Sequence, residues 1–175
     1  QYFYSYLNSK GRAGFVMASS ASEAAKSEKK IRQKLIETGS VEAVVSIGNN
    51  FFYTKSLPCQ LWFLNNAKKQ KENILMIDAR KVFRKINQTL NDFSKDHLEG
   101  LTTIIKNFRG EDVDFKSSKW LKNKFPNGKY EDIESFCKIA SLEQIKENDY
   151  SLTPGRYVGY TIQFDENFDF ENRLS

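Results

Sequence analysis

The feature that most constrains the fold is a set of four short apolar runs within the first 80 residues, separated by a single helical pattern. The runs occupy residues 13–18, 41–47, 59–64 and 74–79. They are rich in aliphatic, β-branched or aromatic side chains, and runs of this length are typical of buried β-strands. Near-continuous apolar strands indicate a sheet that is covered on both faces.

One helix is predicted between the first two strands, over residues 22–38. Its apolar stripe consists of three aliphatic residues, Ile31, Leu35 and Ile36. Either Ser22 or Ser27 is suited to cap its first turn, and Gly39 is suited to end it.

The link between the second and third strands, residues 48–58, is too short to hold a helix that crosses back over the sheet. Neighbouring strands joined by a short loop run antiparallel. We therefore expect an α/β fold with a mixed sheet, in which one strand is antiparallel to its neighbours.

The chain changes character after about residue 85. Ser94 is suited to cap a helix, and Gly110 to end it. The helix carries an apolar stripe of Leu98, Leu101, Ile105 and Phe108. Ser141 and Gln144 form a capping-box pattern, which predicts a second short helix. The second half is therefore predicted to be mainly helical.

The charge of the chain permits nucleic-acid binding without establishing it. Lys and Arg number 27 against 22 Asp and Glu, which gives a formal net charge of +5 and a pI near 9.1. No apolar run approaches the ~20 residues that span a bilayer, and no N-terminal signal pattern is present. Two cysteines do not form a disulfide scaffold, so we expect a cytoplasmic protein without a membrane segment.

Residues that carry chemistry are sparse. His97 is the only histidine, and Cys59 and Cys137 have no partners at metal-ligand spacing. There is no glycine-rich phosphate loop. Asp78 closes a strand, where a hydrogen bond to the next turn is the more ordinary role than catalysis. The residues themselves therefore indicate no catalytic, cofactor-binding or metal site.

Three consecutive aromatic residues in the link after the second strand, Phe51, Phe52 and Tyr53, are the exception. Two roles fit them. They could cover the core, or they could present a ring face on which a nucleic-acid base stacks, a contact that contributes ~1–3 kcal/mol.

Taken in order, the segments resemble the methylation (M) subunit of type I restriction-modification systems, a family of adenine-N6 DNA methyltransferases. The segments are GRAGFVMA (11–18), KIRQKLIE (30–37), VEAVVSI (41–47), NFFYT (50–54), PCQLWFL (58–64), ILMIDAR (74–80), FRGE (108–111), FCKIASLEQI (136–145) and NDYSLTPGRYVG (148–159). Each motif alone is weak, whereas the ordered set is specific.

The resemblance implies the C-terminal part of a Rossmann-like class I methyltransferase sheet with a helical C-terminal extension. Residues 1–84 would form the end of the methyltransferase core, comprising strands five to seven and one added strand. The run at 59–64 would be the antiparallel seventh strand, between the fifth at 14–18 and the sixth at 41–47. Residues 85–175 would form the extension, a natural docking surface for the specificity subunit.

The resemblance also gives the aromatic link a function. In adenine methyltransferases the loop after the sixth strand helps to hold the target base once it is flipped out of the duplex. Phe52 and then Tyr53 are the residues expected to form this target-base pocket. The family often has Thr where this chain has Lys55, and Leu-Pro where it has Ile47 and Gly48. Lys55 is therefore a candidate contact to a DNA phosphate.

Two motifs of the family are absent. The chain has three prolines, none adjacent, so it lacks the Asn-Pro-Pro-aromatic motif that positions the target amine. It also lacks the glycine-rich loop that binds S-adenosylmethionine. Residue 1 is Gln rather than Met, and we expect both motifs in a missing N-terminal part. These 175 residues alone are therefore predicted not to methylate DNA.

The resemblance implies DNA, a specificity subunit and a restriction subunit as partners. The alternative is a non-catalytic DNA- or protein-binding module derived from a methyltransferase fold. In the intact methyltransferase fold the strand at 14–18 would pair with a strand that is missing here, so we expect the isolated chain to self-associate through this edge or to be poorly soluble.

Overall fold

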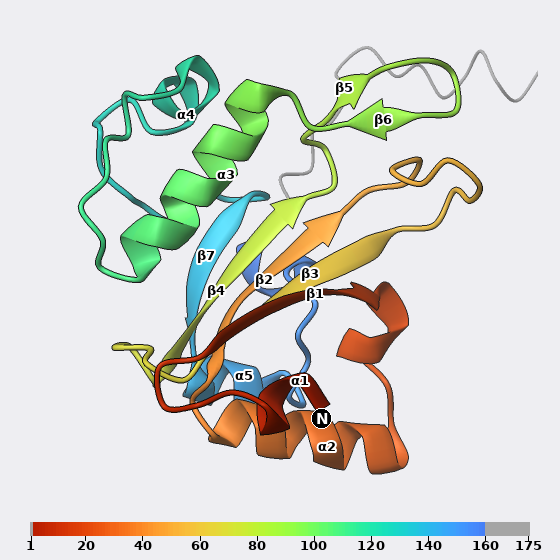
Figure 1. Cartoon of the computed structure of the whole chain (residues 1–175), viewed down its shortest axis with the longest axis vertical. Coiled ribbons are helices and arrows are strands. Elements are labelled where there is room, and N and C mark those ends of the chain that lie inside the picture. The colour runs from red at the N-terminus through yellow and green to blue at the C-terminus, as the bar shows by residue number, and fades with distance from the viewer. Residues whose placement is uncertain (1, 160–175) are drawn as a thin grey trace, which may run out of the picture.

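The computed structural model describes residues 2–159 and contains a mixed five-stranded sheet (Figure 1). The strands are β1 Arg12–Ala18, β2 Val41–Ile47, β3 Cys59–Asn65, β4 Asn73–Ala79 and β7 Cys137–Ser141. Their order across the sheet is β1-β3-β2-β4-β7. The four strands predicted from the apolar runs are thus confirmed.

Strand β3 lies between β1 and β2 and runs antiparallel to both. Its Trp62 is opposite Phe15 of β1 on one side and Val44 of β2 on the other. Strands β2 and β4 are parallel. The prediction of one antiparallel strand between two others is therefore confirmed, and the parallel strands β1, β2 and β4 all end at the same edge of the sheet.

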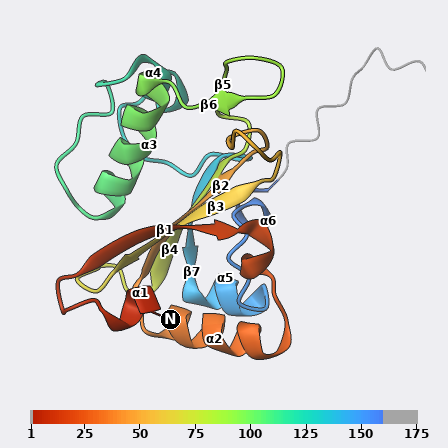
Figure 2. The ribbon, with the colours of Figure 1, turned by 45° about the vertical axis from the view of Figure 1, so that its right-hand side comes forward.

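Helices cover both faces of the sheet (Figures 1 and 2). They are α1 Tyr2–Ser5, α2 Lys26–Glu37, α3 Lys95–Phe108, α4 Lys119–Lys124, α5 Leu142–Glu147 and α6 Gly155–Val158, with a 3-10 turn η1 at Ser19–Ser22. On β2, Val45 faces the core layer that contains Ile104 of α3. Val44 faces the opposite layer, with Ile36 of α2 and Ile145 of α5. Burial on both faces explains why β2 has no polar-apolar alternation.

Helix α2 begins later than predicted. The prediction started it at Ser22 with a serine cap, but η1 ends at Ser22 and the residue that precedes the helix is Ala25, which makes no side-chain cap. The reason is the buried Arg32, which donates hydrogen bonds of 3.1 and 2.8 Å to the backbone carbonyls of Ala21 and Ala24, within η1 and just after it. A helix through the turn would engage those carbonyls itself.

The two caps predicted in the second half are confirmed. The side chain of Ser94 accepts a hydrogen bond from the backbone N–H of His97 at 3.1 Å, and His97 Nδ1 accepts from the Ser94 backbone at 3.4 Å. Ser141 and Gln144 form the expected capping box at the start of α5. The prediction of the apolar stripe on α3 is wrong for one residue. Leu98 is 52% exposed, because it lies on the outer side of α3, where it lines an open groove.

The second half also contributes two structures that the sequence did not reveal. Strand β7 pairs antiparallel with β4 and extends the sheet, so residues after 85 are not only helical. A short hairpin of β5 Arg84–Lys85 and β6 Asn91–Asp92 follows β4. None of the helices in residues 2–159 is long and apolar enough to cross a membrane.

Candidate nucleic-acid interface

Two loops meet at the edge where the parallel strands end. The first, residues 48–58, follows β2, and the second, residues 80–94, follows β4 and contains the β5–β6 hairpin. Because β2 and β4 are parallel neighbours, both loops leave the sheet at the same edge. Figures 1 and 2 show them side by side, beyond the ends of these strands.

Backbone contacts hold the two loops together. The carbonyl of Asn50 accepts a hydrogen bond of 2.7 Å from the backbone N–H of Asn91, and the carbonyl of Asn49 accepts one of 3.1 Å from the Asn91 side chain. At Gly48, an added Cβ would lie 2.6 Å from the carbonyl oxygen of Arg80. The close approach of the two backbones therefore favours glycine at this position.

The three aromatic residues of the first loop do not share one environment. Phe51 packs against Phe93 with ring centroids 4.7 Å apart, so it serves as core cover. Phe52 is 42% exposed and Tyr53 is 93% exposed. Of the two roles open from the sequence, core cover therefore applies to Phe51, whereas Phe52 and Tyr53 are exposed to solvent.

The surroundings of these rings are cationic. Lys55, Lys81 and Lys85 are exposed and have no acidic partner within residues 2–159. Arg84 is paired with Asp92 across the hairpin, through bonds of 2.6 and 2.9 Å. This contact holds the pKa of the Asp92 carboxyl below its ordinary value. Asp92 therefore stays ionised and compensates the charge of Arg84, so the uncompensated positive charge of this surface comes from the three lysines.

Asp78 has the structural role expected from its position. It is 9% exposed and accepts a hydrogen bond of 3.2 Å from the backbone N–H of Arg80. The Arg80 guanidinium also bonds both of its carboxylate oxygens, at 2.5 to 3.1 Å. Both oxygens are engaged locally, so the structure assigns Asp78 to fixing the turn after β4.

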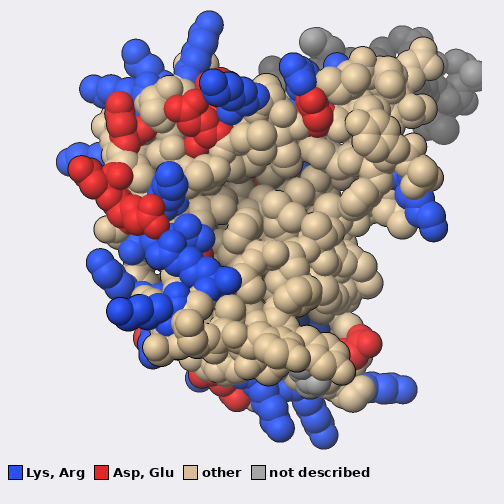
Figure 3. Space-filling view, viewed as in Figure 1, with Lys and Arg blue, Asp and Glu red and all other residues tan. Residues whose placement is uncertain are grey.

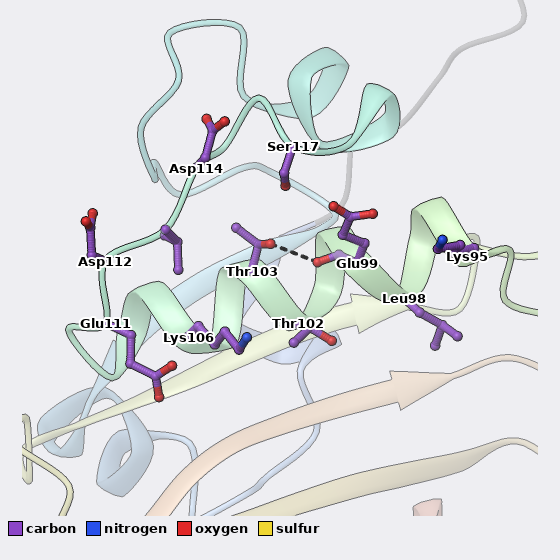
Figure 4. Close-up of a pocket in the computed structure, with 11 residues that line it drawn as sticks. Lys95, Leu98, Glu99, Thr102, Thr103, Lys106, Glu111, Asp112, Asp114 and Ser117 are labelled. Carbon is purple, nitrogen blue, oxygen red and sulfur yellow. Dashed lines mark hydrogen bonds between the residues drawn. The ribbon is translucent and has the colours of Figure 1, made fainter.

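A groove of about 570 Å³ lies elsewhere, along the outer side of α3 (Figure 4). Its lining mixes the lysines Lys95 and Lys106 with several carboxylates, and in Figure 4 the side chains of Asp112 and Asp114 point away from α3. The acidic groups do not converge on a point. Across residues 2–159, no group of His, Cys, Asp or Glu side chains is arranged to hold a metal ion.

The hairpin is the part of this interface that sequence reasoning missed. Its strands have two residues each and no apolar alternation, so periodicity does not reveal them. The available signal is the turn residue Asn87, whose side chain accepts hydrogen bonds from the backbone and hydroxyl of Thr89.

A family model described as N-6 DNA methylase matches residues 1–166 of the chain. The methylase subunit of the type I restriction enzyme HindI from Haemophilus influenzae is 32% identical over 175 residues, which cover 99% of this chain and 36% of the relative. The MjaIX methylase subunit from Methanocaldococcus jannaschii is 34% identical over 167 residues, which cover 94% of this chain and 27% of the relative. The chain thus spans about a third of the length of these curated relatives.

A solved structure has a similar fold. The crystal structure of the type I restriction-modification methyltransferase subunit from Streptococcus thermophilus aligns with a TM-score of 0.70 and 28% sequence identity. The alignment covers 89% of this chain and 28% of that chain. The mixed sheet is therefore methyltransferase-like, as the resemblance implies.

Proposed function

Because the chain belongs to the N-6 DNA methylase family, we propose that it acts as the C-terminal portion of a type I methylation subunit, which transfers a methyl group to adenine N6 in DNA. The match across residues 1–166, with the strand order β1-β3-β2, carries this proposal. The exposure of Phe52 and Tyr53 at the edge of the sheet supports a base-holding role within that subunit.

The described residues do not fit S-adenosylmethionine. The loops that leave the sheet after β1, β2 and β4 contain one glycine, Gly48, and its close approach to the Arg80 carbonyl leaves no open cradle there. No Asn-Pro-Pro-aromatic motif occurs in the sequence. We therefore assign the cofactor and the catalytic amine acceptors to the rest of the subunit.

Within the subunit, the chain's own role is to hold DNA. Phe52 stacks on the flipped adenine, Tyr53 closes the pocket beside it, and Lys55 contacts a phosphate. The helical surface of the second part, which carries the exposed Leu98 on α3, meets the specificity subunit. That subunit reads the DNA sequence, a restriction subunit completes the system, and the assembly works in the cytoplasm.

The test is transfer of labelled methyl groups from S-adenosylmethionine to duplex DNA. We expect no transfer by the 175-residue chain alone and transfer by a subunit of the relatives' length that contains it, with its specificity subunit. Transfer by the isolated chain would refute the assignment of the catalytic groups. No transfer by the longer assembly would support the non-catalytic alternative.

In the active assembly, Phe52→Ala removes a stacking contact worth ~1–3 kcal/mol, so we expect kcat/KM to fall roughly 5- to 150-fold. Ser56→Ala, a change in the same exposed loop, is the matched control and leaves kcat/KM unchanged. Equal activity of Phe52→Ala and the control would remove Phe52 from the pocket.

A further inference from the structure

We propose that the β5–β6 hairpin is a second DNA-contacting element, which holds the duplex beside the flipped base and fills the gap that the base leaves. This inference rests on the proposed function, because it assumes that the loop of Phe52 and Tyr53 faces DNA. It assigns Lys81, just before the hairpin, and Lys85 to phosphate contacts, and Ile86, where the turn begins, to insertion between base pairs.

The position of the hairpin follows from its contacts. Asn91 of β6 donates hydrogen bonds to the carbonyls of Asn49 and Asn50, at 3.1 and 2.7 Å. Phe93, just after β6, packs against Phe51, which precedes Phe52 in the chain. A base held by Phe52 therefore lies next to an element whose position relative to it is fixed.

The tip of the hairpin is ordered by its own hydrogen bonds. The backbone N–H of Ile86 donates to the carbonyl of Leu90 at 2.9 Å, and the Asn87 side chain accepts from the backbone N–H of Thr89, also at 2.9 Å. Ile86 is nevertheless 46% exposed. Ile86 thus presents an aliphatic side chain at the base of a preorganised turn, which reduces the entropy lost on binding.

Exposed apolar residues gather on these two loops. Single exposed hydrophobic residues are ordinary on protein surfaces. Here five of the eleven large ones exposed in residues 2–159, namely Phe52, Tyr53, Leu57, Phe83 and Ile86, lie in residues 48–58 and 80–94. Apolar side chains that insert between base pairs compensate for lost stacking when DNA is kinked or a base is extruded.

The charge of the surface favours DNA over a protein partner. The two loops contain five cations, Lys55, Arg80, Lys81, Arg84 and Lys85, and a single carboxylate, Asp92. Asp92 is bound to Arg84, and Arg80 to Asp78 just outside the loops. Lys55, Lys81 and Lys85 have no acidic partner in residues 2–159, so they match the repeating negative charge of a duplex.

The experiment measures binding of the 175-residue chain to two labelled duplexes by fluorescence anisotropy, over a range of salt concentrations. One duplex is intact, and the other has a single abasic site, which provides a gap without any base flipping. The variants are Ile86→Ser, the double variant Lys81→Gln/Lys85→Gln, and the charge-matched control Lys30→Gln/Lys34→Gln on α2, at the opposite end of the molecule (Figure 1). Circular dichroism verifies that each variant is folded.

We expect the wild-type chain to bind the abasic duplex at least about fivefold more tightly than the intact one, and Ile86→Ser to lose this preference. The Lys81/Lys85 variant should bind both duplexes more weakly, with the slope of log K against log salt reduced by about two. The control pair should change neither the preference nor the slope more than slightly.

The inference is overturned if the hairpin variants bind as the control does, since the hairpin would then face another protein. It is also overturned if the wild-type chain shows no binding at about 100 μM, the weak end of non-specific DNA association. Neither result bears on the proposed methyl transfer, because that activity is measured in a separate experiment with the longer subunit.

Discussion

At the scale of single residues, Gly48 determines how closely the loop after β2 approaches the loop after β4. We expect Gly48→Ala to lower the free energy of unfolding by about 1–3 kcal/mol, because its Cβ would lie 2.6 Å from the Arg80 carbonyl oxygen, a rigid backbone atom. Urea unfolding measures the change, with the exposed Thr54→Ala as control. Equal stability of the two variants would show that the loops separate at little cost.

The buried thiol of Cys137 gives stability a pH dependence. Burial raises the pKa of Cys137 from 9.0 to about 11. The unfolded thiol ionises first, so this contribution is complete below pH 9 and is lost as pH rises to 11. We expect the wild type to lose on the order of 2 kcal/mol more than Cys137→Ala across this window, as measured by urea unfolding at each pH.

Lys68 provides a control of opposite sign. Its ammonium is buried and donates a hydrogen bond of 2.6 Å to the Val41 carbonyl, and burial lowers its pKa from 10.5 to about 8. The folded state gives up this proton first, so the contribution rises between pH 8 and 10.5. Relative to Lys68→Met, the wild type should gain stability over this range. Parallel pH profiles for the wild type and either variant would contradict the assignments.

At the scale of elements, the packing of α3 on α4 depends on Gly100. A Cβ there would lie 2.5 and 2.7 Å from ring carbons of Trp120. Alanine favours helix by about 1 kcal/mol over glycine, but overpacking costs about 1–3 kcal/mol. We expect Gly100→Ala to be destabilising on balance, with a shift in tryptophan fluorescence as Trp120 moves.

The exposed Thr102→Ala, on the same helix, separates the two effects. This substitution raises the helix propensity without a contact to Trp120. The free energy of unfolding of the variant should therefore equal or exceed that of the wild type. If Gly100→Ala behaves in the same way, the ring of Trp120 has room to move aside.

Elements could be predicted where the signal is local. Ser94 and Ser141 cap the helices expected of them, and the four apolar runs form strands. Strand β7 could not be predicted, because CKIAS is not strongly apolar and its partner β4 lies far away in the sequence. Glu42 is a charged residue in an apolar strand, and the sequence does not show its partner, because Arg109, which donates to both of its carboxylate oxygens, is distant in the chain.

The candidate interface was predicted less fully, for a related reason. The sequence indicated Phe52, Tyr53 and Lys55 as residues on one loop. It could not show that Phe51 is covered while its neighbours are exposed, because the ring that covers Phe51 is Phe93, from a different loop. The roles proposed for Phe52, Tyr53 and Lys55 remain predictions that binding and methylation experiments decide.

At the scale of the whole molecule, the face of β1 and β3 that looks away from α2 has little cover. It carries Gly14 and Val16 of β1 and Leu61 and Phe63 of β3, and Val16 is 56% exposed. Figure 3 shows a broad uncharged surface in this region, with Lys and Arg gathered instead near the turn between β3 and β4. Beside it, β1 is the outermost strand and its outer edge has no partner within residues 2–159.

We therefore expect the isolated chain to self-associate through β1. Val16→Lys places a charge on the edge strand, a known means of discouraging edge-to-edge pairing, and should increase the monomer fraction in sedimentation. The exposed Lys122→Gln, far from β1, is the control. A wild-type chain that is monomeric at high concentration would contradict the expectation.

The late position of β7 in the chain has a consequence for synthesis. β4 gains its outer partner only when residues 137–141 are made, and Arg32 of α2 gains the carbonyl of Tyr150 later still, at 2.7 Å. At ~5–20 residues per second, a ribosome needs several seconds between these segments. Throughout that interval the outer edge of β4 stays unpaired, and an exposed strand edge of this kind can pair with other chains.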